Sequence, residues 1–255
     1  MRGFAAFLRK ELREILRTWR IWALPGIVIF FALTGPALAE YTPQLLESLM
    51  TEQPEGLVIQ LPDPTYVDAY LQWTKNLSQI VLFAVIIMFA GMISAEKRSG
   101  TAALVLTKPL SRAAMVLAKF TSQSALLVGT VVVGAGLTWL ATLPFFSDPP
   151  LTPLVQATAV WIVLGLFFLA LMLLISAAID SQAGAAGLGL AAYLVISILT
   201  VWGPAVRYSP AGLVGAPTEI AMGEAGSLLW PIVVTLVLTA ALVAAAVAVF
   251  RRREL

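Results

Sequence analysis

Six long stretches without an ionisable side chain constrain this chain more than any other feature of its sequence. An α-helix needs roughly 20 consecutive apolar residues to cross a bilayer, and each stretch is about that long or longer. Only 12% of the residues are charged and 60% are hydrophobic, a composition far from that of soluble domains. We therefore predict an all-α, polytopic membrane protein with six transmembrane helices, and exclude a nucleic-acid-binding domain, a disulfide scaffold and a disordered chain. The six stretches are residues 21–39, 76–95, 120–147, 149–179, 181–206 and 225–250.

The basic residues fall on alternate connections between these stretches. Of the sixteen Lys and Arg residues, six lie in residues 1–20, five in 96–119 and three in 251–253. Nine of the fourteen acidic residues lie on the other set of connections. Because Lys and Arg in short loops mark the cytoplasmic side, we predict that both termini are cytoplasmic, as an even number of spans requires. The expected location is the cytoplasmic (inner) membrane.

Residues 1–20 predict a basic amphipathic helix ahead of the first span. Apolar residues recur at helical spacing, and Arg9, Arg13 and Arg17 are among the cations that cover the rest. Such a helix lies in the membrane interface with its cations near anionic lipid, or it binds a partner protein; we favour the interface. A cleaved signal peptide over residues 1–39 is an alternative, because the apolar run ends in Ala37-Leu38-Ala39. The long amphipathic start and the even number of spans favour a retained helix.

Two outer connections carry further structure signals. In the acidic loop 40–75, Thr42-Pro43 and Asp63-Pro64 each predict the start of a short helix over the outer face. These helices would rest on the bundle, on the membrane surface or on an external partner, and we prefer the bundle. The outer loop 204–227 is rich in Gly and Pro, so part of it can fold back into the outer leaflet if protein covers its backbone.

Catalytic chemistry has little support in this sequence. Cys and His are both absent, which excludes thiol and imidazole nucleophiles and their metal sites. The six stretches carry no buried acid pair, so we predict no catalytic residue and no metal site, and an intramembrane enzyme is disfavoured. Asp180 and Ser181, in the second cytoplasmic loop, are interpreted as helix-capping residues. Small residues spaced four apart, as in Ala183/Gly187 and Ala185/Gly189, and similarly Gly134 and Gly136, predict close helix packing within the chain or between subunits.

The most informative segment is the cytoplasmic loop 95–119, which follows the second span. The charged residues Glu96, Lys97 and Arg98 precede Gly100 and Thr101. A second cluster then follows a leucine-containing turn, and it consists of Lys108, Pro109, Ser111 and Arg112. Pro109 breaks a helix and Ser111 can cap the next one. The pattern predicts a helix, a break and a second helix that present charges of both signs to a soluble partner.

This segment resembles the coupling loop of the ABC-2 family of ATP-binding-cassette transporter permeases. That loop runs Glu-basic-polar-x-Gly-Thr, a leucine-rich stretch, Pro-x-Ser-Arg and a downstream Lys. The matching residues here are Glu96, Gly100, Thr101, Leu104, Leu106, Pro109, Leu110, Ser111, Arg112 and Lys119. Where the family often carries Leu-Glu-like residues, this chain has Ala102-Ala103.

The resemblance implies a coupling helix that docks onto a separate ATP-binding subunit. It also implies that residues 1–20 form a connector helix touching the same subunit, with Arg9, Arg13 and Arg17 as contacts, and that two permeases pair with two ATPases. Residues 21–255 would then form one six-helix transmembrane domain. The chain has no G-x-x-x-x-G-K-[ST] loop, so ATP and Mg²⁺ would bind to the partner and no cofactor to this chain.

The leading functional hypothesis is therefore the permease subunit of an ABC exporter. One alternative transmits ATP-driven motion to an extracytoplasmic partner, as in the maturation of metalloenzymes, and another is a non-transporting membrane scaffold. The spans carry almost no ionisable group and no charged pocket, which predicts an apolar or amphipathic cargo.

Overall fold

Six helices in the described part of the chain are long and apolar enough to cross a membrane, as the charge-free stretches predict. The computed structural model describes residues 3–50, 63–100 and 111–252, leaving aside the side chains of residues 20 and 47–50. These ranges contain helices and no strand. The candidate spans are Ile21–Leu46, Tyr66–Arg98, Arg112–Thr142, Leu151–Ala178, Gln182–Leu199 and Leu229–Arg252.

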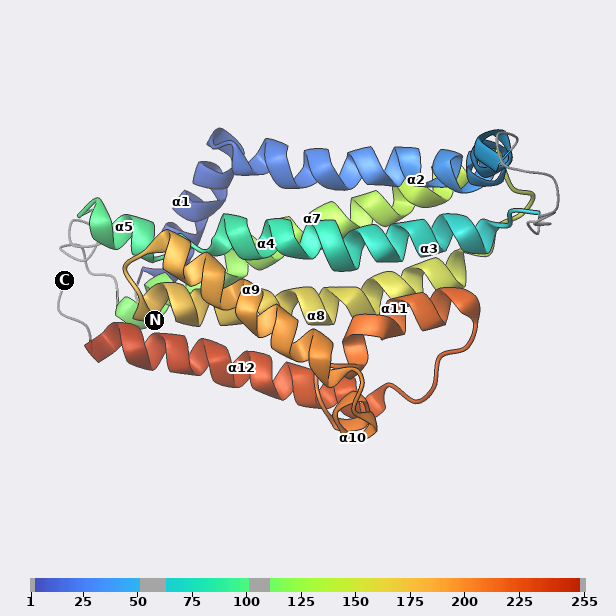
Figure 1. Cartoon of the computed structure of the whole chain (residues 1–255). Helices are drawn as coiled ribbons and strands as arrows, with labels where there is room; N and C mark the ends of the chain where they lie inside the picture. Colours follow the sequence, from blue (N-terminus) through green and yellow to red (C-terminus); the bar gives the residue numbers. More distant parts are fainter. Residues whose placement is uncertain (1–2, 51–62, 101–110, 253–255) are drawn as a thin grey trace.

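Most of the long helices run lengthwise along one bundle axis, and α9 crosses it obliquely (Figure 1). The second span is composite, because its helix passes through a π-helical turn and is then interrupted near its end. The elements are α1 Phe4–Arg17, α2 Arg20–Met50, α3 Tyr66–Asn76, η1 Leu77–Val81, α4 Leu82–Phe89, α5 Ser94–Arg98, α7 Arg112–Thr142, α8 Leu151–Ala178, α9 Gln182–Leu199, α10 Gly203–Tyr208, α11 Gly212–Met222 and α12 Leu229–Arg252.

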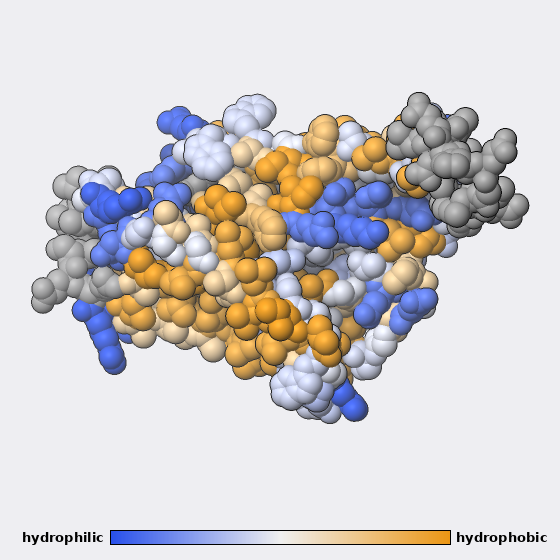
Figure 2. Space-filling view, in the orientation of Figure 1, coloured by the Kyte–Doolittle hydropathy of each residue, from blue (hydrophilic) through white to orange (hydrophobic). Residues whose placement is uncertain are grey.

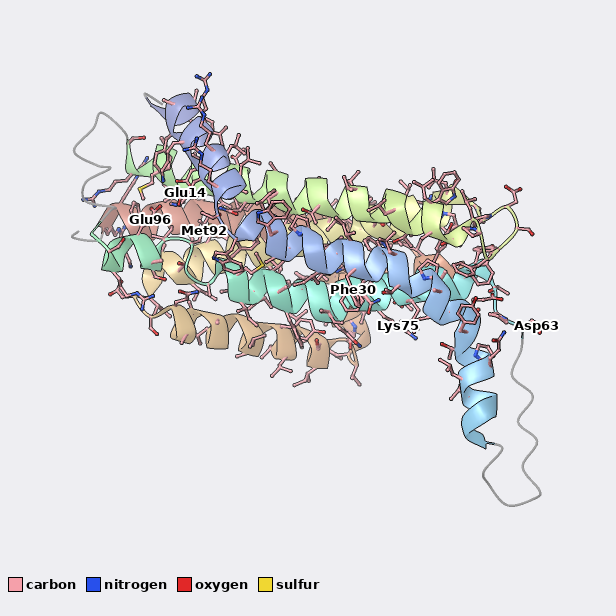
Figure 3. The ribbon with its side chains drawn as sticks, turned by 90° about the horizontal axis from the view of Figure 1, so that it is seen from above. Glu14, Phe30, Asp63, Lys75, Met92 and Glu96 are labelled. Carbon is pink, nitrogen blue, oxygen red and sulfur yellow. The ribbon has the colours of Figure 1, made fainter. Side chains whose placement is uncertain are left out.

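Both termini lie at the same end of the bundle, together with α1, α5, the start of α7 and the turn between α8 and α9 (Figure 1). We call this the terminal end, and the opposite one the far end. Helix α1 lies across the terminal end, steeply inclined to α2 (Figures 1 and 3). Two termini on one side are what an even number of spans requires. The cytoplasmic assignment of that side stays a prediction.

The second and fourth spans form the centre of the bundle, with 67% and 61% of the residues in their most apolar windows buried. Buried polar atoms fix the two spans against each other. Nε1 of Trp73 donates to Oγ1 of Thr158 at 3.1 Å, and the hydroxyl of Tyr70 donates to the carbonyl of Pro150 at 3.0 Å. Gly134 of α7 packs so closely here that a Cβ would overlap Trp73. The aromatic core thus requires a glycine on the neighbouring helix.

The fifth and sixth spans are peripheral, because only 11% and 17% of the residues in their apolar windows are buried. Figure 2 shows a broad apolar surface along the middle of this face of the bundle. The small residues of α9 divide between two faces. Ala185 and Gly189 are buried, and a Cβ on Gly189 would collide with α8 and α4, whereas Ala183 and Gly187 are exposed. The prediction of close packing is confirmed within the chain for Ala185 and Gly189. For Ala183 and Gly187 it stays a prediction.

The structure corrects the expectation of two separate short helices over the outer face. Residues 42–50 continue α2, which contains Pro36 and Pro43 and runs to Met50. Prolines inside a helix bend it, and the last turns of α2 point away from the bundle (Figure 3). Helix α3 does begin after Asp63-Pro64, with a capping box between Thr65 and Asp68. It then continues into the second span, because its aromatic residues belong to the core.

The Gly- and Pro-rich loop 204–227 folds back on the bundle, as the sequence suggested. It forms α10 and α11, and α11 packs against α8 and α3. Leu213, Ala216 and Ile220 are buried in this contact. A glycine is required where the two short helices approach, because a Cβ on Gly212 would overlap the carbonyl oxygen of Val206.

Candidate functional site

The second span is interrupted between α4 and α5, just before the predicted coupling loop. The break leaves backbone N–H groups without helical acceptors. Ser176 of α8 satisfies them: its Oγ accepts from the amide of Ile93 at 2.9 Å and from that of Ser94 at 3.0 Å. Both serine side chains are fully buried. At the same place Gln182 of α9 covers Gly91 so closely that a Cβ would lie 2.9 Å from its Cδ. The break is therefore held by α8 and α9.

Helix α5 is attached to the α8–α9 turn by an ion pair. Nζ of Lys97 lies 2.5 Å from Oδ1 of Asp180 and donates to the carbonyl of Ala177 at 3.2 Å. Lys97 thereby also neutralises the negative end of the α8 dipole. The expected cap of α9 is Ser181, whose Oγ accepts from the amide of Gly184 at 3.1 Å. Asp180, which shared that interpretation, instead pairs with Lys97.

A buried ion-pair cluster joins α5 to α1 and α7. Nζ of Lys119 lies 2.7 Å from Oε1 of Glu96 and 3.2 Å from Oε2 of Glu11. The side chains of Lys119 and Glu11 are only 4% and 3% exposed, and that of Glu96 is 17% exposed. Burying one of these charges without the others would cost several kcal/mol. The three helices are therefore energetically linked at this point.

Lys10 extends the cluster toward the surface. Its Nζ lies 3.0 Å from Glu11, 2.5 Å from Glu14 and 3.9 Å from Glu96. Burial by itself lowers the pKa of Lys10, but the hydrogen bonds and charges of Glu14 and Glu11 outweigh it and raise the pKa above its ordinary value. Three carboxylate oxygens, from Glu11, Glu14 and Glu96, lie close enough together to hold a metal ion. Because the ammonium groups of Lys10 and Lys119 already pair with these carboxylates, we interpret the cluster as ion pairs.

The start of α7 is fixed by two residues of the predicted motif. Oγ of Ser111 caps the helix by accepting from the amide of Ala114 at 3.1 Å, which confirms the predicted cap. Arg112 donates from Nη1 to the carbonyl of Arg251 at 2.8 Å, at the carboxyl end of α12. Its guanidinium thus connects the coupling region to the last span. The positive charge also interacts favourably with the negative, carboxyl end of the α12 dipole.

Other predicted site residues are exposed at the terminal end. Arg98 ends α5 and makes no ion pair with a described residue. Gly100 follows with φ +71°, the left-handed conformation that closes many helices and suits glycine. Thr101, Lys108 and Pro109 lie outside the described residues. On α1, the predicted connector residues Arg9, Arg13 and Arg17 are exposed.

Sequence reasoning missed Glu11 and Ser176. Glu11 occupies the buried stripe of α1 with Phe7 and Ile15, at spacings of four residues. A carboxylate on the apolar face of an amphipathic helix is the signal that could have revealed it. Ser176 lies in the long apolar stretch of α8, where no local pattern distinguishes it from the other small residues.

The fold and the site define a class of protein. It is a helical, multi-pass membrane protein in which ion pairs join charged helix ends at one end of the bundle. Residues 5–208 match the family described as ABC-2 family transporter protein. Since this match covers most of the chain, the protein belongs to that family, which consists of transmembrane permease components of ABC transporters. The chain is also similar to the uncharacterized transmembrane protein YxlG of Bacillus subtilis (strain 168), with 23% identity over 220 residues, 86% of this chain and 83% of that protein.

Proposed function

We propose that this chain is the permease subunit of an exporter in the cytoplasmic membrane, driven by a separate ATP-binding subunit that docks on the terminal end. Family membership supports a permease that works with an ABC ATP-binding subunit. The observation that carries the finer proposal is the attachment of α5 on two sides. Lys97 and Ser176 connect it to α8 and the α8–α9 turn, and Glu96 connects it to α7 and α1.

This double attachment suits a part that transmits force. The loop that follows α5 is the predicted docking segment, and a push on it would reach the bundle through α5. Buried ion pairs and hydrogen bonds resist separation because each partner left alone would be uncompensated. A displacement of α5 would therefore move α8, α7 and α1 together. In this mechanism the product of ATP hydrolysis in the partner is helix motion in this chain.

The contact surface for the ATP-binding subunit would include the exposed Arg98, the predicted loop residues Thr101, Lys108 and Pro109, and Arg9 near the start of α1. Two copies of each subunit would form the complete transporter, with ATP and Mg²⁺ bound by the ATPases. The exposed apolar faces of α9 and α12 leave room for a second permease. In this arrangement the terminal end is cytoplasmic.

A polar stripe on the second span supports export. Gln72, Lys75, Asn76 and Gln79 recur at the spacing of one helical face, and all four are exposed or half-buried. Figure 2 shows a polar patch in this part of an otherwise apolar surface, and Lys75 lies set back along the bundle from Asp63 at the far end (Figure 3). Polar groups within a span usually face the bundle interior or a water-filled path.

Lys75 also refines the expected cargo. The sequence placed it in an outer loop, but the structure places it in helix α3, within the candidate span Tyr66–Arg98. Among the described residues it has no ion-pair partner. An exposed cation on the proposed path favours an amphipathic cargo with an anionic group over a purely apolar one.

One observation favours a second function, the transmission of motion to an extracytoplasmic partner. The last turns of α2 project away from the bundle at the far end (Figure 3). Leu45 and Leu46 on these turns are 55% and 41% exposed. A helix that extends from a moving span would carry motion to a protein outside the membrane.

Affinity purification from native membranes in mild detergent tests the proposed function. We expect mass spectrometry to find an ATP-binding subunit in one-to-one ratio with this chain. Arg98→Glu should lower its recovery, whereas the matched control Arg207→Glu, on α10 away from the terminal end, should not. Repeated absence of any ATP-binding subunit would contradict the proposal and favour the scaffold interpretation.

A further inference from the structure

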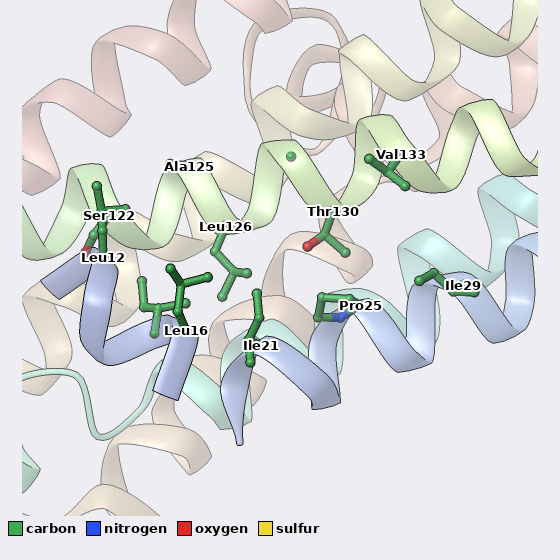
Figure 4. Close-up of a pocket in the computed structure, with 12 residues that line it drawn as sticks. Leu12, Leu16, Ile21, Pro25, Ile29, Ser122, Ala125, Leu126, Thr130 and Val133 are labelled. Carbon is green, nitrogen blue, oxygen red and sulfur yellow. The ribbon is translucent and has the colours of Figure 1, made fainter. Parts of the chain in front are cut away.

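An apolar groove runs along the side of the bundle where α1, α2 and α7 meet (Figure 4). Its volume is about 540 Å³, within the range of sites that bind small molecules. The groove begins beside α1 at the terminal end and continues between α2 and α7. The residues that line it are Leu12, Ile15, Leu16, Ile21, Pro25, Ile29, Ser122, Ala125, Leu126, Gly129, Thr130 and Val133.

The groove has the length of one membrane leaflet. On α7 it extends from Ser122 to Val133, which corresponds to about 16 Å at 1.5 Å per residue. The hydrocarbon core of a bilayer is about 30 Å thick, so one leaflet accounts for about half of that. A single acyl chain that enters from the interface and ends near the midplane would occupy this length.

Charge identifies the headgroup end. Residues on a helix follow each other at about 100°, so Arg13 and Arg17 lie one step around α1 from the groove residues Leu12 and Leu16. Both arginines are exposed, and neither makes an ion pair with a described residue. The neighbouring cation Lys10, by contrast, is already paired with Glu11 and Glu14. Two exposed guanidinium groups, without an ion-pair partner among the described residues, are therefore available on α1 next to its groove-lining residues.

We propose that this groove binds one anionic phospholipid, with an acyl chain between α1, α2 and α7 and its phosphate on Arg13 and Arg17. The bound lipid would fill the wedge under α1 and stabilise its position across the bundle end. This inference goes beyond the proposed function, since it does not depend on the ATP-binding subunit or on cargo.

Two kinds of substitution separate the acyl site from the headgroup site. Gly129→Leu and Ala125→Leu each fill the groove. Nothing lies within 4 Å of a Cβ built on Gly129, and Ala125 is exposed, so a larger side chain can start at either position without a Cβ clash. Gly136→Leu is the matched control, because that glycine is on the same helix, has the same open space and does not line the groove. Arg13→Gln/Arg17→Gln removes the headgroup charges, and Arg98→Gln/Arg252→Gln is its control at the same bundle end.

The experiment is native mass spectrometry of the full chain in detergent with phosphatidylglycerol or phosphatidylcholine of identical acyl chains. We expect one phosphatidylglycerol retained per chain with about 30-fold preference, the value for two arginines that each contribute the affinity typical of a basic residue at an anionic surface. Gly129→Leu and Ala125→Leu should lose the retained lipid, and Arg13→Gln/Arg17→Gln should lose only the preference. Both controls should retain lipid, and prefer phosphatidylglycerol, as the wild type does.

Equal retention of the two lipids by the wild type would overturn the proposal. Retention by both groove-filling variants would also overturn it. A cross-link through the groove to a second copy of this chain would show that the groove is a subunit interface and overturn it as well. Recovery of the ATP-binding subunit with Gly129→Leu, measured in parallel, keeps a failure of this proposal distinct from a failure of the proposed function.

Discussion

Nζ of Lys119 lies 2.7 Å from Oε1 of Glu96, and this pair joins the start of the third span to the short helix that precedes the coupling loop. Glu11 of α1 completes the contact on the other side of the ammonium group. The terminal end thus has one buried point through which the connector helix, the coupling region and a span are held together.

Removal of that ammonium group should destabilise the fold. Lys119→Met leaves Glu11 and Glu96 with only the half-exposed Lys10 as a neighbouring cation, and loss of one partner of a buried ion pair costs up to about 3–5 kcal/mol. We expect a lower denaturation midpoint in detergent for Lys119→Met and partial recovery in Glu11→Gln/Lys119→Met. If the single variant were as stable as the wild type, the cluster would not link the helices.

Ser176 should matter through its two backbone hydrogen bonds. Ser176→Ala leaves the amides of Ile93 and Ser94 without their buried acceptor, at a cost of about 1–3 kcal/mol. The variant should show faster hydrogen exchange at these two amides and a lower midpoint. Thr121→Ala is the control, because that exposed hydroxyl only donates within its own helix. Equal exchange rates in both variants would show that Ser176 does not stabilise the interruption between α4 and α5.

The glycines of α7 give a matched pair for testing the packing of the core. Gly134→Ala should destabilise by about 1–3 kcal/mol because its methyl group would overlap Val28 and Trp73. Gly136→Ala meets open space and should stabilise the helix by about 0.5–1 kcal/mol. Thermal unfolding of the two variants measures the difference. Similar midpoints would mean that α7 does not approach the aromatic core this closely.

Lys75 should influence cargo more than stability. Lys75→Met keeps the length of the side chain but removes the exposed cation from the polar stripe. Export of an anionic amphipathic cargo, measured in vesicles that contain the complete transporter, should fall severalfold. ATP hydrolysis in the absence of cargo should be unchanged. Unaltered export of all anionic cargo would show that the polar stripe does not line the transport path.

Much of the fold could be predicted because membrane spans leave a strong local signal. Charge-free stretches identify six helices, and Ser111 and Ser181 were recognisable caps because a serine stood just before each helix. The position of α3 was not predictable in this way. Tyr70 and Trp73 are amphipathic residues that suit a membrane surface as well as a core. Their burial and their hydrogen bonds to α8 and its preceding loop assign them to the bundle.

The sequence predicted many of the charged residues of the candidate site, but not which residues they pair with. The charged residues of the coupling loop were visible in the sequence, whereas their partners come from distant helices. Glu96 pairs with a residue 23 positions later and Ser94 is bonded by one 82 positions later. Such pairs depend on how the spans pack, which local periodicity does not encode.

The central claim is that the terminal end docks on an ATP-binding subunit, and cross-linking in native membranes tests it most directly. Because the sequence contains no Cys, Arg98→Cys creates a single reactive thiol on α5 for a photoactivatable maleimide. Glu224→Cys, after α11, serves as the matched control. The account predicts that Arg98→Cys alone is joined to a protein with a G-x-x-x-x-G-K-[ST] loop. An ATP-binding subunit joined only to Glu224→Cys, or to neither variant, would contradict it.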